Sequence, residues 1–229
     1  MNPRAAWKKS SVSWTANPQF EEIVINTTRQ GSSQIGEILL LGVEEIIGRS
    51  GVNAVLNLAE QVPHASIHKD EPSVRIGYTN VAAITIGLEM MYGPRGGRGV
   101  ALRAGRAGFK YLLRQYGTTM GIIDINYRML PVPVRLKSGM QALAGLMAQL
   151  GDEIVTVGEH ESTWTWMAER CPHCWQRKLE EPACHFPVGM LQEFLAWASS
   201  GRVYGVREIE CMASGGLACL IQINKKALD

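Results

Sequence analysis

Cysteine is the residue type that offers most chemistry in this sequence, and it is unevenly distributed. All five cysteines lie in the last third of the 229 residues: Cys171, Cys174, Cys184, Cys211 and Cys219. Thiols at this density bind a soft metal, form redox pairs, or pack as small apolar side chains. The odd number argues against a complete disulfide framework. We expect a bound metal that ties down the C-terminal half of the chain.

The spacing of three cysteines indicates how a metal site forms. Cys211 and Cys219 flank a Ser-Gly-Gly turn at 214–216, which predicts a hairpin with the two thiols opposite one another on one sheet face. Cys184 lies just before a predicted helix, whose N-terminus favours a thiolate. Four ligands of sulfur with nitrogen or oxygen suit tetrahedral zinc. The candidates for the fourth ligand are Glu208, Glu210, His185 or the pair Cys171 and Cys174.

The segment from Cys171 to Cys174 is a CxxC motif with three interpretations. This spacing is typical of a zinc knuckle and also of thioredoxin-like redox pairs. The third interpretation is two reduced thiols in a turn, without a ligand. The sequence around the motif lacks the strand–CxxC–helix context of a βαβ unit, which disfavours the redox interpretation.

The elements that must position these cysteines are predicted from hydrophobic periodicity. Helices are expected at 35–58 (with breaks at Gly48 and Gly51), 82–91, 100–116 and 136–150. A turn at 92–97 separates the second and third helices. Strands are expected at 154–157, 162–167, 203–212 and 217–223, and a helix at 186–199. Helices followed by strands predict an α+β fold, in which a helical N-terminal half packs on an antiparallel sheet. Residues 1–30 are expected to form an N-terminal arm, and 31–229 the ligand-binding domain.

One predicted helix has a distinctive face. In 100–116, small residues recur at Ala101, Ala104, Gly105 and Gly108. Small side chains let a neighbouring helix or a ligand come close to the backbone. The stripe therefore indicates either tight helix packing or a ligand contact.

Composition limits the function classes. A net charge of +2 disfavours broad nucleic-acid binding, and no apolar stretch is long enough for a membrane span. The polar, basic N-terminus lacks the apolar region of a secretory signal, so we expect a cytoplasmic protein. The sequence shows no Rossmann GxGxxG, flavin motif, Ser–His–Asp constellation or recognisable paired carboxylates. These observations favour a non-catalytic protein.

The cysteine-containing segments together resemble a known family. They are Cys171–Pro–His–Cys174, then Pro182–Ala–Cys184–His–Phe, then Glu208–x–x–Cys211–x–x–x–Gly215–x–x–x–Cys219. This pattern resembles the V4R (4-vinyl reductase) domain. The Tyr-Gly-Pro-Arg-Gly-Gly-Arg turn that starts at 92 and the helix after it are also typical of bacterial V4R proteins. The resemblance covers roughly residues 35–225.

The resemblance implies a fold, a metal and a mode of binding. V4R domains share an α+β fold with subunits of the TRAPP trafficking complex and with haem-NO sensing domains. They commonly form homodimers and bind small hydrophobic ligands in an internal pocket. The family's structural zinc implies Cys184, Glu208, Cys211 and Cys219 as ligands here, with Cys171 or Cys174 as alternatives. Residues 208 and 211 face opposite sides of a regular strand, so this set requires a bulge or strand break near Ile209.

The resemblance also implies residues for the pocket. Trp164 lies about twenty residues before the first zinc cysteine, where related sensors have a pocket tryptophan, and Trp166 faces the same way. The alternative for both is ordinary hydrophobic core. No histidine lies between His68 and His160 to match the pocket histidine of phenol sensors. The pocket is therefore expected to suit a lipid, a hydrocarbon or a tetrapyrrole.

Two other functions remain open from the sequence. One is an enzyme or accessory factor of (bacterio)chlorophyll or tetrapyrrole metabolism, acting on a vinyl-bearing precursor. The other is an interaction scaffold like a TRAPP subunit.

Overall fold

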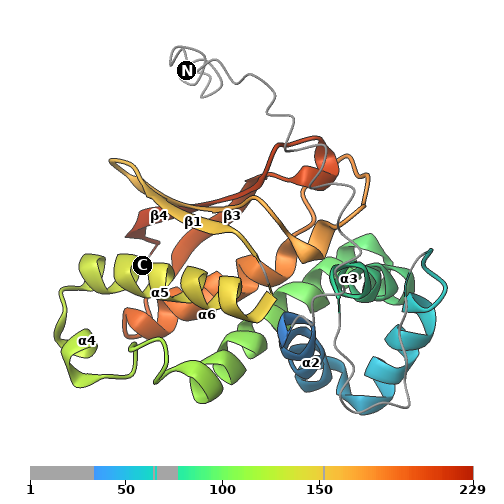
Figure 1. Ribbon diagram of the computed structural model, residues 1–229, viewed down its shortest axis with the longest axis horizontal. Coiled ribbons are helices and arrows are strands. Elements are labelled where there is room, and N and C mark those ends of the chain that lie inside the picture. The colour runs from blue at the N-terminus through green and yellow to red at the C-terminus, as the bar shows by residue number, and fades with distance from the viewer. Residues whose placement is uncertain (1–33, 64, 66–76, 152, 229) are drawn as a thin grey trace. The chain divides into compact units, whose positions relative to one another are not determined.

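Two long helices, a pair of shorter ones and a four-stranded sheet form most of the computed structural model, which describes residues 34–63, 65, 77–151 and 153–228 (Figure 1). The predicted arm at 1–30 lies outside the described residues, as do His64 and His68. Helices occupy the first part of the chain, and all the strands of the described part follow residue 154. The α+β prediction is confirmed.

The long helices α2 (Gln34–Ala59) and α3 (Tyr78–Tyr116) are each interrupted at a glycine. Gly48 has φ 71° and Gly93 has φ 74°, a left-handed conformation that glycine adopts without steric cost. The predicted break at Gly48 is confirmed, whereas Gly51 stays helical. The predicted turn at 92–97 is a kink at Gly93 and Pro94, so the helices expected at 82–91 and 100–116 form one element.

Three further helices follow. The short α4 (Ile125–Met129) was not expected from the sequence, and Asp124 caps it by accepting a hydrogen bond from the Asn126 backbone N–H at 2.7 Å. The helices α5 (Val132–Gly151) and α6 (His185–Ala198) lie close to their predicted positions.

The sheet is antiparallel throughout, with strand order β1-β2-β4-β3. Its strands are β1 (Val155–Glu159), β2 (Thr163–Ala168), β3 (Tyr204–Glu210) and β4 (Cys219–Ala227). Helix α5 contacts β1 and helix α6 contacts β3, so both helices cover the same face of the sheet (Figure 1). Trp164 pairs with Ile223 and Trp166 with Ile221, and all four side chains are buried in the main core between these layers.

Glycines set the spacing between helices α3 and α6. A Cβ at Gly105 would lie 2.0 Å from the carbonyl oxygen of Phe186, and one at Gly189 would lie 1.9 Å from that of Leu102. No side chain fits at these separations, so the two backbones touch directly. The small-residue stripe of 100–116 therefore serves close helix packing. This contact also places the first turn of α6, and with it Cys184.

Within the part of the chain that the structure describes, no helix is both long and apolar enough to cross a membrane.

Candidate metal centre

All five cysteines meet at one end of the sheet, although they come from separate elements. Cys171 follows β2, Cys174 ends the 3-10 turn η3 (Pro172–Cys174), and Cys184 precedes the first residue of α6. Cys211 lies between β3 and the turn η4 (Met212–Ser214), and Cys219 begins β4. Each is buried, with at most 3% of its surface exposed. With Ala168 and Ala213 they form a second, smaller core.

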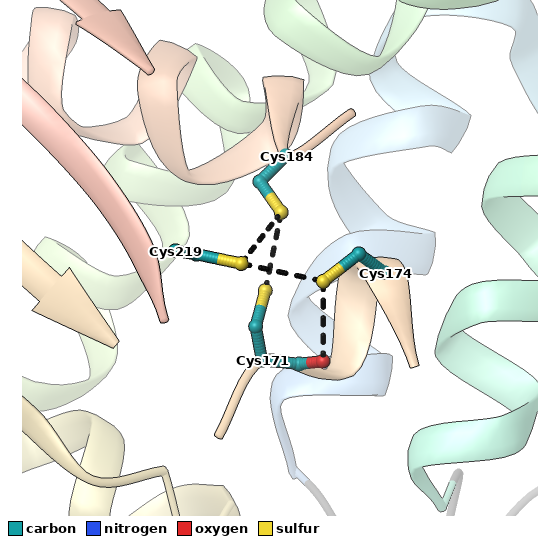
Figure 2. Close-up of side chains that lie close together, drawn as sticks. All are labelled: Cys171, Cys174, Cys184 and Cys219. Carbon is teal, nitrogen blue, oxygen red and sulfur yellow. Dashed lines mark hydrogen bonds between the residues drawn. The ribbon is translucent and has the colours of Figure 1, made fainter. Parts of the chain in front are cut away.

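The sulfur atoms of the cluster are within contact distance. Figure 2 shows four of the thiols pointing toward one another, with Cys171 Sγ 3.3 Å from Cys184 Sγ and Cys174 Sγ 3.3 Å from Cys219 Sγ. Cys184 Sγ lies 3.6 Å from Cys219 Sγ and 3.8 Å from Cys211 Sγ. Cys211 Sγ also lies 3.9 Å from Cys219 Sγ. No pair is bonded as a disulfide.

Two overlapping groups of four residues could each hold a metal ion. One is Cys171, Cys174, Cys184 and Cys219; the other is Cys184, Glu208, Cys211 and Cys219. Within each group the ligand atoms all lie within 4.8 Å of one another, and every residue is buried. The second group is the set that the resemblance implies, and the first contains both of its alternatives.

Glu208 reaches the cysteines because strand β3 is irregular. Glu208 pairs with Ile221 and Glu210 pairs with the adjacent Leu220, so Ile209 is an extra residue on β3. This bulge is the irregularity that the predicted ligand set requires, because it turns residues 208 and 211 to the same side. Glu208 is 8% exposed, and its Oε2 accepts a hydrogen bond from the Cys184 backbone N–H at 2.8 Å.

The other carboxylate oxygen of Glu208 has no partner. Oε1 is buried and accepts no hydrogen bond from the described residues. Burial raises the pKa of this carboxyl, and the hydrogen bond from the Cys184 N–H opposes that rise only in part. Burial of an unpaired carboxylate costs several kcal/mol of folding free energy, and a cation bound nearby offsets a cost of this order. Glu208 Oε1 is therefore free to bind a metal.

The predicted hairpin forms, because β3 and β4 are consecutive antiparallel neighbours, but the prediction that it places Cys211 opposite Cys219 is wrong. Strand β3 ends at Glu210, the turn η4 intervenes, and Cys219 pairs with Ala168 of β2 instead. The connection from β3 to β4 is longer than the expected Ser-Gly-Gly turn, because it includes η4, which is capped by Gly215 at φ 90°. The two sulfurs still meet, because Cys211 folds back under the end of β4 at 3.9 Å.

The thiols influence one another's ionisation. Hydrogen bonds from Cys171 and the other cluster thiols lower the pKa of Cys174, whereas contacts with Cys171 and the other thiols raise the pKa of Cys184 well above its ordinary value. Contact with Cys174 raises the pKa of Cys211, but hydrogen bonds from Cys184 and Cys219 outweigh this effect, so the pKa of Cys211 is also lowered. Ionisation of the remaining thiols is disfavoured. All of them can be ionised together only when a cation balances their charge.

The other fourth-ligand candidates lie outside both groups. Glu210 is exposed, and His185 belongs to neither group. Burial, with Arg98 and Arg177 nearby, lowers the pKa of His185 to about 4 and keeps its imidazole neutral at physiological pH. His173, inside the CxxC motif, is buried and stacks on Phe186 with ring centroids 5.0 Å apart, so it packs without joining either group.

The two predicted pocket residues lie in the main core. Trp164 and Trp166 are each 2% exposed and point to the helix-covered face of the sheet. The indole Nε1 of Trp164 is buried and donates no hydrogen bond to any described residue. The Lys225 ammonium lies 5.5 Å from the centroid of the Trp164 ring, a cation–π distance.

The sequence of this end of the chain matches a known family. Residues 164–225 match the V4R domain. The resemblance that the sequence predicted is therefore confirmed over these residues. The V4R match runs from Trp164 into β4 and includes all six members of the two metal-ligand groups.

Solved structures with a similar fold extend the comparison beyond the V4R match. An H-NOX protein from S. oneidensis in the Fe(II)NO ligation state has a TM-score of 0.55 at 13% identity, covering 84% of this chain and 98% of that chain. An Fe(II) unliganded H-NOX protein from K. algicida has a TM-score of 0.52 at 12% identity, covering 83% and 96%. An oxygen-binding H-NOX domain related to soluble guanylate cyclases has a TM-score of 0.51 at 12% identity, covering 86% and 95%.

At these identities the comparison concerns the fold alone, and it agrees with the predicted relation to haem-NO sensing domains. No curated protein matches this sequence.

Proposed function

We propose that this chain is a V4R-type binding protein for a hydrophobic small molecule, stabilised by a structural zinc ion. The V4R match to residues 164–225 carries the proposal, because these residues supply both the sheet face with the tryptophans and the metal-ligand residues. The sheet and helices α5 and α6 are the layers that would enclose the ligand. The zinc would join the end of β3 and the start of β4 to the start of α6.

The zinc ligands in this proposal are Cys184, Glu208, Cys211 and Cys219. Their three sulfurs are 3.6, 3.8 and 3.9 Å apart. Zinc–sulfur bonds of about 2.3 Å in a tetrahedron place two sulfurs roughly 3.8 Å apart, so the three thiols match one triangular face. The unpartnered Oε1 of Glu208 supplies the fourth ligand atom. Four protein ligands leave no open position, which makes the zinc structural and not catalytic.

Trp164 and Trp166 are the proposed ligand contacts. A buried indole N–H without an acceptor is unfavourable by about 1–3 kcal/mol. A ligand with one hydrogen-bond acceptor in an otherwise apolar body would satisfy the N–H of Trp164. A lipid, a hydrocarbon carrying one polar group, or a tetrapyrrole has this chemistry.

Mass spectrometry of molecules extracted from the purified chain tests the proposal. We expect one hydrophobic compound in near-stoichiometric amount, and its release when the protein is denatured in organic solvent. Re-addition to ligand-free protein should quench tryptophan fluorescence, and the double variant W164F/W166F should show much less quenching. A wild-type protein that carries no compound and binds none of these three classes contradicts the proposal.

A second candidate is a tetrapyrrole-binding accessory factor. It is favoured by the fold shared with H-NOX proteins, whose structures are described in Fe(II) and Fe(II)NO states. Titration with a porphyrin tests this candidate directly. A Soret shift that saturates at one equivalent supports it, and an unchanged porphyrin spectrum contradicts it.

The homodimer implied by the resemblance is also a proposal. Light scattering coupled to size exclusion should give twice the chain mass of 25.2 kDa. A monomer mass would contradict it.

A further inference from the structure

A single zinc ion leaves part of the cluster unexplained, whichever group of ligands it uses. If zinc binds Cys184, Glu208, Cys211 and Cys219, then Cys171 and Cys174 are two buried thiols in contact with metal-bound sulfurs at 3.3 Å. If zinc binds the four thiols that include the CxxC motif, then the Glu208 carboxylate stays buried with an unpartnered oxygen. The two groups together use all six side chains.

The two groups share one edge. Cys184 and Cys219 belong to both, and their sulfurs are 3.6 Å apart. Cys171 and Cys174 lie against this edge through the 3.3 Å contacts to Cys184 and Cys219 respectively. Cys211 also contacts both shared sulfurs, at 3.8 and 3.9 Å. The six ligands thus form two tetrahedra joined at the Cys184–Cys219 edge.

We propose that this cluster holds two divalent metal ions, bridged by the thiolates of Cys184 and Cys219. One ion would be completed by Cys171 and Cys174, and the other by Cys211 and Glu208. The proposal adds a second ion to the zinc site proposed above and rests on it.

Charge and coordination chemistry are consistent with two ions. Five thiolates and one carboxylate carry six negative charges, and two divalent ions bring four positive charges. A single ion would leave a larger uncompensated charge in the buried cluster or require protonated thiols beside it. Soft thiolate ligands in tetrahedral groups select zinc among the common divalent ions. The N-terminus of α6, which Cys184 precedes, further stabilises the residual negative charge.

Metal stoichiometry of the full chain tests the proposal. The protein is expressed with added zinc, purified without chelator or metal-affinity resin, and measured by native mass spectrometry and elemental analysis. We expect two zinc ions per chain. One zinc per chain overturns the second ion and leaves the first site standing, whereas no zinc removes both. Iron with acid-labile sulfide overturns the two-zinc cluster.

Single variants separate the two positions. C174S and C211S should each retain one zinc, because each removes a terminal ligand of only one ion. C219S should lose both, because it removes a bridge. The matched control is L217S, because Leu217 lies between Cys211 and Cys219 and is 97% exposed. This variant should retain two zinc ions. A C174S protein with the same zinc content as the wild type overturns the proposal.

Cobalt substitution keeps the bridge testable if a cysteine variant does not fold. Two Co²⁺ ions that share thiolate ligands are magnetically coupled. The electron paramagnetic resonance signal of the wild-type protein should therefore rise with the first equivalent of Co²⁺ and fall with the second. A signal that increases in proportion to both equivalents overturns the bridge.

Discussion

At the residue scale, Glu208 distinguishes a metal centre from a packed thiol core. Its Oε1 lacks a partner, and burial raises the pKa of the carboxyl. Without a metal, E208Q should stabilise the protein, because it removes a poorly solvated acid. With zinc present, the same change removes a ligand and should lower the melting temperature.

Melting temperatures measured with zinc and with a chelator show whether the effect of E208Q on stability changes sign. The control is E210Q, which alters an exposed carboxylate two residues away and should change neither melting temperature. If E208Q and E210Q behave alike in zinc, Glu208 is not a ligand.

Trp164 offers a second test at this scale. W164F removes an indole N–H that donates no hydrogen bond to any described residue. The loss of folding free energy in this variant should therefore come only from the smaller buried ring. If a bound ligand accepts that N–H, ligand affinity should fall by about 2- to 10-fold, the equivalent of roughly one net hydrogen bond. Calorimetric titration of the extracted ligand measures the change. W166F is the matched control, and an equal loss of affinity in both variants would argue against a specific hydrogen bond.

At the scale of elements, the close packing of α6 on α3 positions Cys184, a candidate metal ligand. G189A would place a methyl group 1.9 Å from the Leu102 carbonyl oxygen, so α6 must move away. We expect a loss of about 1–3 kcal/mol in the free energy of unfolding, together with weaker zinc binding, because Cys184 immediately precedes α6.

Urea unfolding and a zinc competition assay measure the two effects. The control is G145A in α5, where a new Cβ meets nothing within 4 Å and should stabilise the helix by about 0.5–1 kcal/mol. A G189A protein as stable as the wild type would show that α3 and α6 can separate without cost.

The end of β1 is joined to its neighbours by an ion-pair network that depends on pH. Glu159 pairs with Lys137 of α5 and with Lys225 of β4. Hydrogen bonds from Lys137 and Lys225 lower the pKa of the Glu159 carboxyl to about 2. Because the folded-state pKa is depressed, the stabilisation is present above the ordinary value of 4.5 and is lost as the pH falls toward 2.

Amide hydrogen exchange of the β1–β2 hairpin between pH 6 and pH 2 follows this loss. After correction for intrinsic rates, protection should fall over that range in the wild type and in E161Q, a neighbouring exposed control. It should already be reduced at pH 6 in E159Q. Equal protection in E159Q and wild type at pH 6 would show that the network does not hold the hairpin.

At the scale of the whole molecule, the described part of the chain has two separate cores. The large one joins the helices to the sheet through Trp164, Trp166 and their neighbours, and the small one contains the cysteines. In zinc-finger peptides, which have almost no other core, structural zinc contributes on the order of 10 kcal/mol of folding free energy. Here the large core contains none of the candidate metal ligands.

Chelation should therefore loosen one end of the sheet and leave the helices folded. Hydrogen exchange with mass spectrometry should show faster exchange in 169–184 and 208–219 after chelation, and unchanged exchange in α3 and α5. Cooperative loss of all helical signal on chelation would contradict the separation of the two cores.

The sequence by itself determined the α+β class, most element positions, the family resemblance and the residues of the cysteine cluster. These features follow from local periodicity and from residue types, and both are readable along the chain. Even the bulge at Ile209 was deducible, because Glu208 and Cys211 cannot share a face of a regular strand.

Only the tertiary structure decided which thiols meet. Cys171 and Cys184 are 13 positions apart along the chain, and Cys174 and Cys219 are 45 apart, so their 3.3 Å contacts depend on the packing of separate elements. The same is true of the register of the β3–β4 hairpin, where the turn residues indicated a bend but not the longer connection that leaves Cys211 without a partner across the sheet. Periodicity describes the face of an element, whereas partners across the fold depend on how several elements pack at once, and that information is not local in the sequence.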